Sequence, residues 1–310
     1  MQKLHFFLVL CLAFLLPPAV NAASHAFLWT ATGGMQDLGT LGGSYCAATG
    51  INNSGQVVGY SYLPGDTVFH PFIWTARDGM VDLGLPEGVS TLQGVAINSR
   101  GHIIASSPNA QGLSYFWSSD KGFVPISLGA GVEIDATGMN DFDEVTGTEK
   151  PPGGAATAFI WQLFGRQGRS LGTYPGGTFS QGEAINNLGH VVADGNITAL
   201  SLPAGEAPYI IVLQFQKGRG WRFLGGIDYG TLPTANNNKD EVVAFTMDIF
   251  STDKAIFFNG EGLFIMQPLQ YSFAAHALAI NESGVIVGVS FGKPLLQRVR
   301  QKLKWSGSAI

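Results

Sequence analysis

The stretch Ile51-Asn52-Asn53-Ser54-Gly55-Gln56-Val57-Val58-Gly59 recurs, with variations, six times along the chain. The asparagines that open the copies lie 46, 42, 46, 51 and 44 residues apart: Asn52, Asn98, Asn140, Asn186, Asn237 and Asn281. A repeat of about 45 residues indicates one small structural unit copied along or around an axis. The repeats therefore predict an architecture, and the chemistry is left to the loops that differ between copies.

Each copy is predicted to hold four short strands separated by clusters of Gly, Pro, Asn and Ser. In the first complete copy the strands are expected at residues 47–51, 56–60, 71–74 and 80–83. The third strand usually ends in an aromatic residue, as in Phe72-Ile73-Trp74, and Leu-Gly follows the fourth, as in Asp82-Leu83-Gly84. We interpret the aromatic residues as packing between neighbouring sheets rather than as a ligand cage.

The segment between the first two strands of each copy is predicted to be a tight turn. Asn opens a type I turn, and the residue three positions later takes the left-handed conformation that favours glycine. Four copies have Gly at this position, and two have Asp143 or Asp240. Because Asp tolerates positive φ better than most residues, we expect the change Asp143→Gly to be neutral or stabilising.

Four strands in 42 to 51 residues is the size of a propeller blade. We therefore predict an all-β fold, a β-propeller of about six four-stranded repeats, with six blades favoured and seven as the alternative. Residues 27–39 resemble the second half of a unit and residues 277–291 the first half, so these N- and C-terminal strands are predicted to close the ring. Trp29 and Trp305 both stand at the aromatic-strand position, which leaves one strand too many for six blades.

The first copy contains His25-Ala26-Phe27-Leu28-Trp29-Thr30 and then Asp37-Leu38-Gly39, ahead of the asparagine phrase. In these motifs the chain resembles the HAF-repeat family of bacterial exported proteins, named for its His-Ala-Phe triplet. The resemblance covers residues 25–290 and weakens through the fifth copy. It implies an extracytoplasmic, propeller-like repeat protein, and it brings no established activity and no catalytic residues.

Residues 1–22 are predicted to be a secretory signal peptide. Lys3 provides a basic head, residues 4–16 are largely apolar, and Val20-Asn21-Ala22 fits a small-residue cleavage site. The apolar run is shorter than the roughly 18 residues expected of a membrane-spanning helix, so no transmembrane segment is expected after cleavage. We therefore expect an exported protein, periplasmic or extracellular, whose residues 23–310 form a single repeat domain.

Composition narrows the classes of ligand. The formal net charge is −5 and only 13% of the residues are charged, which argues against nucleic acid as a partner. Cys46 is the only cysteine beyond the signal peptide, and we interpret it as a small buried core residue. Motifs typical of metal, nucleotide or nucleophile sites are absent from the sequence. We therefore expect no cofactor, no metal and no catalytic residue.

Two sets of residues stand out as candidate binding sites. The positions that directly follow the six turns would converge in a closed ring, which predicts an axial polar ring of Gln56, His102, Glu144, His190 and Glu241. Near the C-terminus, basic residues alternate along one predicted strand face and would suit an anionic lipid, glycan or protein: Arg298, Arg300, Lys302 and Lys304. The alternative for this basic strip is a charged edge strand that resists aggregation.

These features favour an exported, non-catalytic binding or scaffold module for a protein or glycan partner. Peripheral contact with an acidic surface would use the basic strip. The alternative is a hydrolase or lyase that acts on polysaccharide from a propeller scaffold, which would need two carboxylates in one cleft. A structure separates the two hypotheses by showing whether carboxylates converge in an axial pocket.

Overall fold

The computed structural model describes residues 24–30, 33–108, 112–197, 210–226, 230–246, 253–268, 272–292 and 308–309. Within these ranges the chain is almost entirely β-structure, with one short 3-10 helix, η1 (Phe164–Arg166). The predicted signal peptide and the predicted basic strip lie outside the described residues. No helix in the described ranges is long and apolar enough to cross a membrane.

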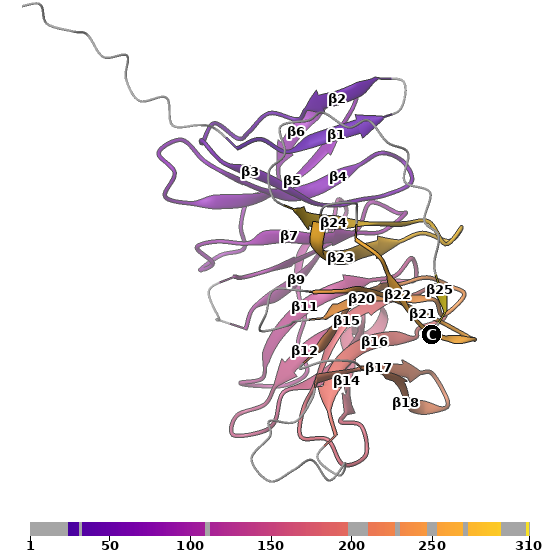
Figure 1. Cartoon of the computed structure of the whole chain (residues 1–310). Coiled ribbons are helices and arrows are strands. Elements are labelled where there is room, and N and C mark those ends of the chain that lie inside the picture. Colours follow the sequence, from indigo (N-terminus) through magenta and orange to yellow (C-terminus); the bar gives the residue numbers. More distant parts are fainter. Residues whose placement is uncertain are drawn as a thin grey trace, which may run out of the picture.

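Five complete blades follow one plan, four antiparallel strands hydrogen-bonded in chain order (Figure 1). Blade one contains β3 (Cys46–Ile51), β4 (Val57–Tyr62), β5 (Phe69–Thr75) and β6 (Gly79–Asp82). Blade two contains β7 (Gln93–Ile97), β8 (Ile103–Ser106), β9 (Ser114–Ser118) and β10 (Gly122–Pro125). Blade three contains β11 (Glu133–Met139), β12 (Glu144–Lys150), β13 (Thr157–Gln162) and β14 (Gln167–Gly172).

Blades four and five repeat the plan after longer connections. Blade four contains β15 (Ser180–Ile185), β16 (Val191–Asn196), β17 (Ile210–Gln216) and β18 (Gly220–Gly225). Blade five contains β19 (Thr231–Asn236), β20 (Val242–Thr246), β21 (Ala255–Asn259) and β22 (Gly262–Met266). A short fifth strand, β25 (Ser308–Ala309), pairs with the outer edge of β22.

Two hairpins supply the strands of a sixth repeat. The N-terminal hairpin contains β1 (Phe27–Thr30) and β2 (Gly34–Asp37), and the C-terminal hairpin contains β23 (Ser272–Ile280) and β24 (Ile286–Gly292). In the structure the hairpins form two separate two-stranded sheets. Five blades and these two half-blades confirm the predicted all-β propeller of about six repeats. The predicted closure differs, because the N- and C-terminal strands do not pair with each other among the described residues. The strands of blade one begin and end within two residues of their predicted positions.

The core lies between successive blades, where the predicted aromatic residues pack. Trp161 and Phe72 are completely buried, and Trp161 of blade three contacts Phe116 of blade two with ring centroids 6.2 Å apart. In blades one, two, four and five the two apolar residues that start the second strand are buried on both faces, as at Val191 and Val192. These contacts confirm that the third-strand aromatics serve packing.

The turn after the first strand has the predicted geometry in every copy. The residue three positions after Asn has positive φ, 74° at Gly55 and 61° at both Asp143 and Asp240. The Asn side chain fixes the turn, since Oδ1 of Asn186 accepts hydrogen bonds from the backbone N–H groups of Leu188 and His190, both at 3.0 Å. The other five asparagines accept the same pair of bonds.

The residues behind the family resemblance join the third and fourth strands. Nδ1 of His70 lies 2.9 Å from both carboxylate oxygens of Asp82, and one of these oxygens accepts a hydrogen bond from the Gly84 N–H. His25 and Asp37 repeat this contact at 2.7 Å. In blade three the hydroxyls of Thr157 and Ser170, 2.9 Å apart, occupy the same place. The His-Ala-Phe and Asp-Leu-Gly motifs therefore join the third strand to the fourth through side-chain hydrogen bonds.

Candidate functional site

The first strands of successive blades contact one another and surround the propeller axis. Each contains a one-residue bulge three positions before the turn asparagine, so these residues are unpaired: Thr49, Val95, Thr137, Glu183, Thr234 and Leu278. A bulge re-aims the side chain of its extra residue. Cavities of about 350 Å³ and 880 Å³ lie at the two ends of these strands.

The smaller cavity lies at the end where the six turns meet. Each of the first five turn asparagines donates a hydrogen bond from Nδ2 to the backbone carbonyl of the asparagine in the next repeat, at 2.8–3.2 Å. We call these five bonds, from Asn52 to Asn281, the asparagine ladder. Within the described residues no such bond joins Asn281 back to Asn52. The asparagine ladder therefore joins neighbouring blades at this end through its amide and carbonyl groups.

The second Nδ2 hydrogen of each ladder asparagine has an acceptor that alternates between copies. In the first, third and fifth copies the acceptor belongs to the same turn: Gln56, Glu144 and Glu241. In the second and fourth copies it is an aspartate of the next turn, Asp143 for Asn98 and Asp240 for Asn186. The turn aspartates therefore add a second hydrogen bond between blades two and three and between blades four and five.

The predicted axial polar ring is placed elsewhere by the structure. Gln56, His102, Glu144, His190 and Glu241 line neither axial cavity. They lie at the first residue of the second strand or directly before it, and they turn toward neighbouring blades. There His102 Nδ1 lies 2.7 Å from Asp143 and His190 Nδ1 lies 2.8 Å from Asp240. Glu144 accepts a bond from Lys217 Nζ at 3.1 Å. The positions that line the cavity at this end follow the asparagine by one residue, and include Asn53, Ser99 and Asp141.

The Asp143 carboxylate accepts three bonds that the sequence did not reveal, from Asn98 Nδ2, Arg100 Nη1 and His102 Nδ1. The expectation for Asp143→Gly is therefore reversed. We now expect a loss of about 2 kcal/mol in unfolding free energy, because the buried Asn98 and the partly buried His102 lose an acceptor and only part of that cost is offset by relief of strain. Urea denaturation measures it. The control is Arg166→Gly, at an exposed residue with φ 48°, which should be neutral or stabilising.

The larger cavity, about 880 Å³, opens at the opposite end of the first strands. We call it the acidic cavity. Blades two to five contribute its lining, and each of the four contributes at least one polar side chain, with Lys150 of β12 among them. The side chains of Gln93, Glu133, Asp135 and Gln181 have no hydrogen-bond partner among the described residues, and neither has that of Lys150. This leaves donors and acceptors of both kinds facing an open volume of ligand size.

A carboxyl cluster forms the inner wall of the acidic cavity. Burial, together with the nearby Asp194 and Asp135 carboxylates, raises the pKa of Glu183 to about 8. Burial also raises the pKa of Asp194 to about 6 and that of Asp135 above its usual range. At neutral pH Glu183 therefore keeps its proton and donates it to Asp194 in a side-chain hydrogen bond. Asp194 is only 2% exposed, and its Oδ1 has no partner within the described chain.

Glu183 is the bulge residue of blade four and the only charged residue at this position of the six repeats. The bulge threonines of blades one, three and five instead donate hydrogen bonds to the next blade, as Thr137 Oγ1 does to Gly182 O at 2.7 Å. Sequence reasoning did not single out Glu183. An alignment of the copies on their asparagines carries the signal, since one acid stands among threonines and apolar residues.

Metal-ligating groups and the described cysteine are the other candidates for a site. In the part of the chain that the structure describes, no group of three His, Cys, Asp or Glu side chains is arranged to hold a metal ion. Cys46 is buried in the core of blade one, and burial raises the pKa of its thiol. The acidic cavity is therefore the place in the described chain where free polar groups converge.

No family model and no curated protein matches the chain. Among solved structures, TolB from Acinetobacter baumannii aligns at 13% identity and a TM-score of 0.49, over 72% of this chain and 54% of TolB. The SapL1 lectin in complex with alpha methyl fucoside aligns at 14% and 0.45, over 80% and 88% of the two chains. Virginiamycin B lyase from Staphylococcus aureus aligns at 10% and 0.42, over 81% and 85%. The chain spans about half the length of TolB.

Proposed function

We propose that this chain is an exported, HAF-repeat-like β-propeller that binds a neutral glycan in the acidic cavity. The observation that carries the proposal is the set of unpartnered amides and carboxylates on the cavity wall, Gln93, Glu133, Asp135 and Gln181. Amide and carboxylate groups together match the alternating donors and acceptors of sugar hydroxyls. Glu183, whose proton is donated to Asp194, adds a carbonyl oxygen as a further acceptor on the cavity wall.

The shape and charge of the cavity favour a neutral glycan over a protein or a polyanion as its ligand. A volume of about 880 Å³ lies within the range of small-ligand pockets, whereas protein partners bind mainly over broad, flatter surfaces. Three carboxyl residues line the cavity, Glu133, Asp135 and Glu183, against a single cation, Lys150. Polyanions such as nucleic acid or uronic-acid polymers would be repelled.

Binding of neutral oligosaccharides by the full chain tests the proposal, with a glycan array to find the ligand and calorimetry to measure Kd. Asp135→Asn should weaken binding at least tenfold, because hydrogen bonds to charged acceptors contribute about 1.5–3 kcal/mol. Gln181→Ala should weaken it about fivefold. Glu87→Gln, in an exposed turn, is the matched control and should leave Kd unchanged. Equal affinity in all four proteins would show that the ligand binds elsewhere.

One observation favours a second candidate, a glycoside hydrolase. Glu183 holds a proton at neutral pH beside other carboxyl groups, which is the arrangement that supplies a general acid and a base. In that case the unmodified protein releases reducing ends from the bound oligosaccharide, and Glu183→Gln abolishes release while binding persists. A protein that binds the sugar and releases none is a lectin-like module.

A further inference from the structure

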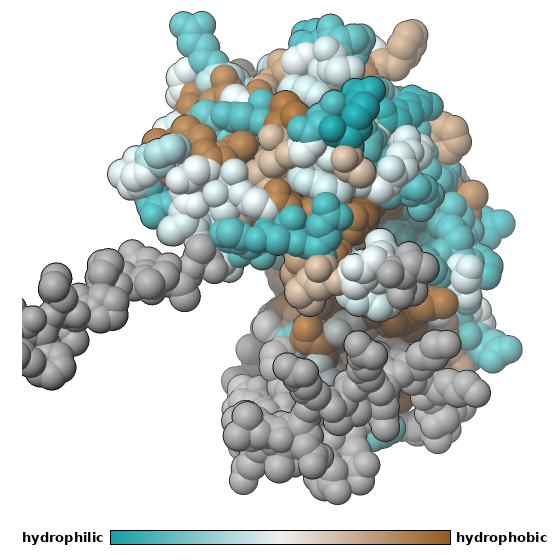
Figure 2. All heavy atoms as spheres, turned by 90° about the horizontal axis from the view of Figure 1, so that it is seen from above, coloured by the Kyte–Doolittle hydropathy of each residue, from teal (hydrophilic) through white to brown (hydrophobic). Residues whose placement is uncertain are grey.

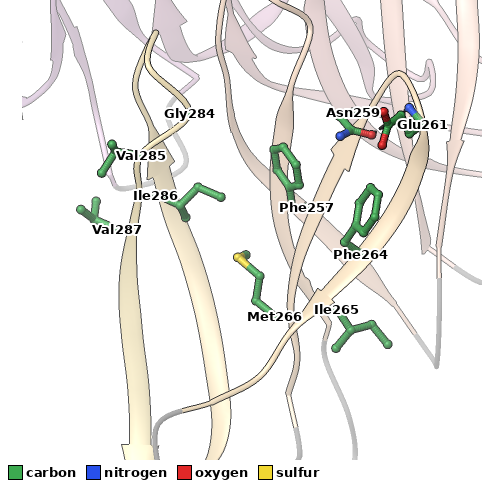
Figure 3. A pocket seen from close by; sticks show the side chains of 10 residues that line it. All are labelled: Phe257, Asn259, Glu261, Phe264, Ile265, Met266, Gly284, Val285, Ile286 and Val287. Carbon is green, nitrogen blue, oxygen red and sulfur yellow. Dashed lines mark hydrogen bonds between the residues drawn. The ribbon is translucent and has the colours of Figure 1, made fainter. Parts of the chain in front are cut away.

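An apolar pocket of about 630 Å³ lies between the outer strands of blade five and the C-terminal hairpin (Figure 3). Phe257, Phe264 and Met266 approach it from β21 and β22, and Ile286 approaches it from β24. Val285 and Val287 point to the other side of β24. Between blades four and five the corresponding space is filled by Ile256, Phe258 and Leu263, from the third and fourth strands of blade five.

The N-terminal hairpin exposes apolar side chains that are buried in the other blades. Phe27, Trp29 and Met35 are 54%, 62% and 69% exposed, whereas the residues equivalent to Trp29, such as Trp74 and Trp161, are 4% and 0% exposed. Figure 2 looks down on the end of the molecule that carries β1 and β2, and hydrophobic side chains are visible there among polar ones. The opposite face of the hairpin packs on blade one through Ala26, Leu28 and Leu38.

Each of the two hairpins has a strand edge that is paired in the other blades and unpaired here. Among the described strands, β24 pairs only with β23 and β1 pairs only with β2. In all five blades the second strand pairs with the third, and the residue five positions after the turn asparagine lies opposite the third-strand aromatic. The pairs are Val57–Trp74, Ile103–Trp117, Val145–Trp161, Val191–Phe215 and Val242–Phe258.

We infer that the apolar pocket is the docking site of the N-terminal hairpin of the same chain, which completes blade six by pairing β1 with β24. The shared register places these residues opposite each other: Ile286 and Trp29, Val287 and Leu28, Gly288 and Phe27. Phe258, which is equivalent to Trp29, packs toward the preceding blade. By that equivalence Phe27 and Trp29 face blade five, and Met35, opposite Trp29 in the hairpin, faces it too.

Closure also supplies the missing bond of the asparagine ladder. Asn281 already forms the same turn as the other five asparagines, so its Nδ2 is placed to donate to the carbonyl of Asn52 once the sixth blade meets the first. Burial of the exposed aromatic and methionine side chains drives the docking. Pairing of β1 with β24 removes two free sheet edges, which are otherwise sites of aggregation.

A disulfide trap in the full chain tests this register. In a background with Cys11→Ser and Cys46→Ala, the pair Leu28→Cys and Val287→Cys lies directly opposite on one sheet face and should oxidise to an intrachain disulfide in most molecules. The control pair Phe27→Cys and Val287→Cys is displaced by one residue, so its side chains lie on opposite faces and should not cross-link. Non-reducing electrophoresis and intact mass score both pairs.

Three other results would overturn the inference. The first is a disulfide-linked dimer, which would mean that the hairpin docks on a second copy. The second is equal cross-linking of both pairs, and the third is no cross-link in either. A single-cysteine measurement guards against a trap that fails to fold. The thiol of Phe27→Cys should react with a maleimide at least tenfold more slowly than that of Asp78→Cys, at an exposed turn residue. Equal rates show that the hairpin remains open.

Discussion

Replacing Glu183 by glutamine should raise the free energy of unfolding at pH 9 by an amount on the order of 4 kcal/mol and leave it nearly unchanged at pH 4. The folded protein holds the Glu183 proton up to a pKa of about 8, whereas the ordinary value is 4.5. Each pKa unit corresponds to about 1.4 kcal/mol. Glutamine keeps a donor toward Asp194 and carries no proton to lose, so the penalty disappears.

The pH dependence has a defined sign. Between pH 4.5 and about 8 the folded state binds a proton at Glu183 that the unfolded state has lost, so stability falls as pH rises across this window. Urea denaturation at several pH values measures the slope in the unmodified protein and in Glu183→Gln. Glu87→Gln, in an exposed turn, should keep the original slope. A Glu183→Gln protein with that same slope would mean that Glu183 is ionised in the folded chain.

The change Asn186→Ala should cost about 4 kcal/mol, an amount comparable to the whole stability of a marginal domain. Asn186 is buried and makes four bonds: two accepted from its own turn, one donated to Asn237 O at 2.8 Å and one to Asp240 at 3.1 Å. Each buried group left without its partner costs about 1–3 kcal/mol. The turn and the junction between blades four and five are lost together.

Thermal and urea unfolding measure this loss. Asn53→Ala is the matched control, because Asn53 is an exposed asparagine of the first turn with no hydrogen bond from its side chain to the described chain. It should change stability by less than about 0.5 kcal/mol. The variant Asn186→Asp separates the two roles, since it keeps the acceptor for the turn and removes the donor to blade five. Equal stability of Asn186→Ala and Asn53→Ala would show that the ladder contributes nothing.

The blade and its turn could be predicted because they depend on residues close together in sequence. The Asn-x-x-Gly segment encodes its turn within five residues, and aspartate replaces glycine without a change of backbone, as Asp143 and Asp240 show. Because the sequence repeats, the same local prediction applies to all six copies. Ring closure could be proposed from the two half-repeats, but their pairing depends on contacts between residues about 260 positions apart.

The acidic cavity could not be predicted in the same way. Counting along a strand assigns side chains to faces only while the pleat is regular, and the bulge three residues before each asparagine interrupts it. Asp135, Glu183 and Asp194 come from three strands in two blades, so their convergence depends on how the blades pack. The axial polar ring was predicted at the position after the turn, which in the structure leads into the second strand and points its side chain toward a neighbouring blade.

Two kinds of side-chain hydrogen bond alternate between successive blades, and one junction has neither kind. Threonines at the bulge bridge blades one to two, three to four and five to six, while aspartates at the turn bridge two to three and four to five. From the sixth repeat to the first, the bulge residue is Leu278 and the turn residue is Gly55, so neither bridge can form. The ring therefore has one junction that lacks both kinds of bridge. We expect unfolding to begin at this junction and to proceed from the first and sixth repeats toward blade three.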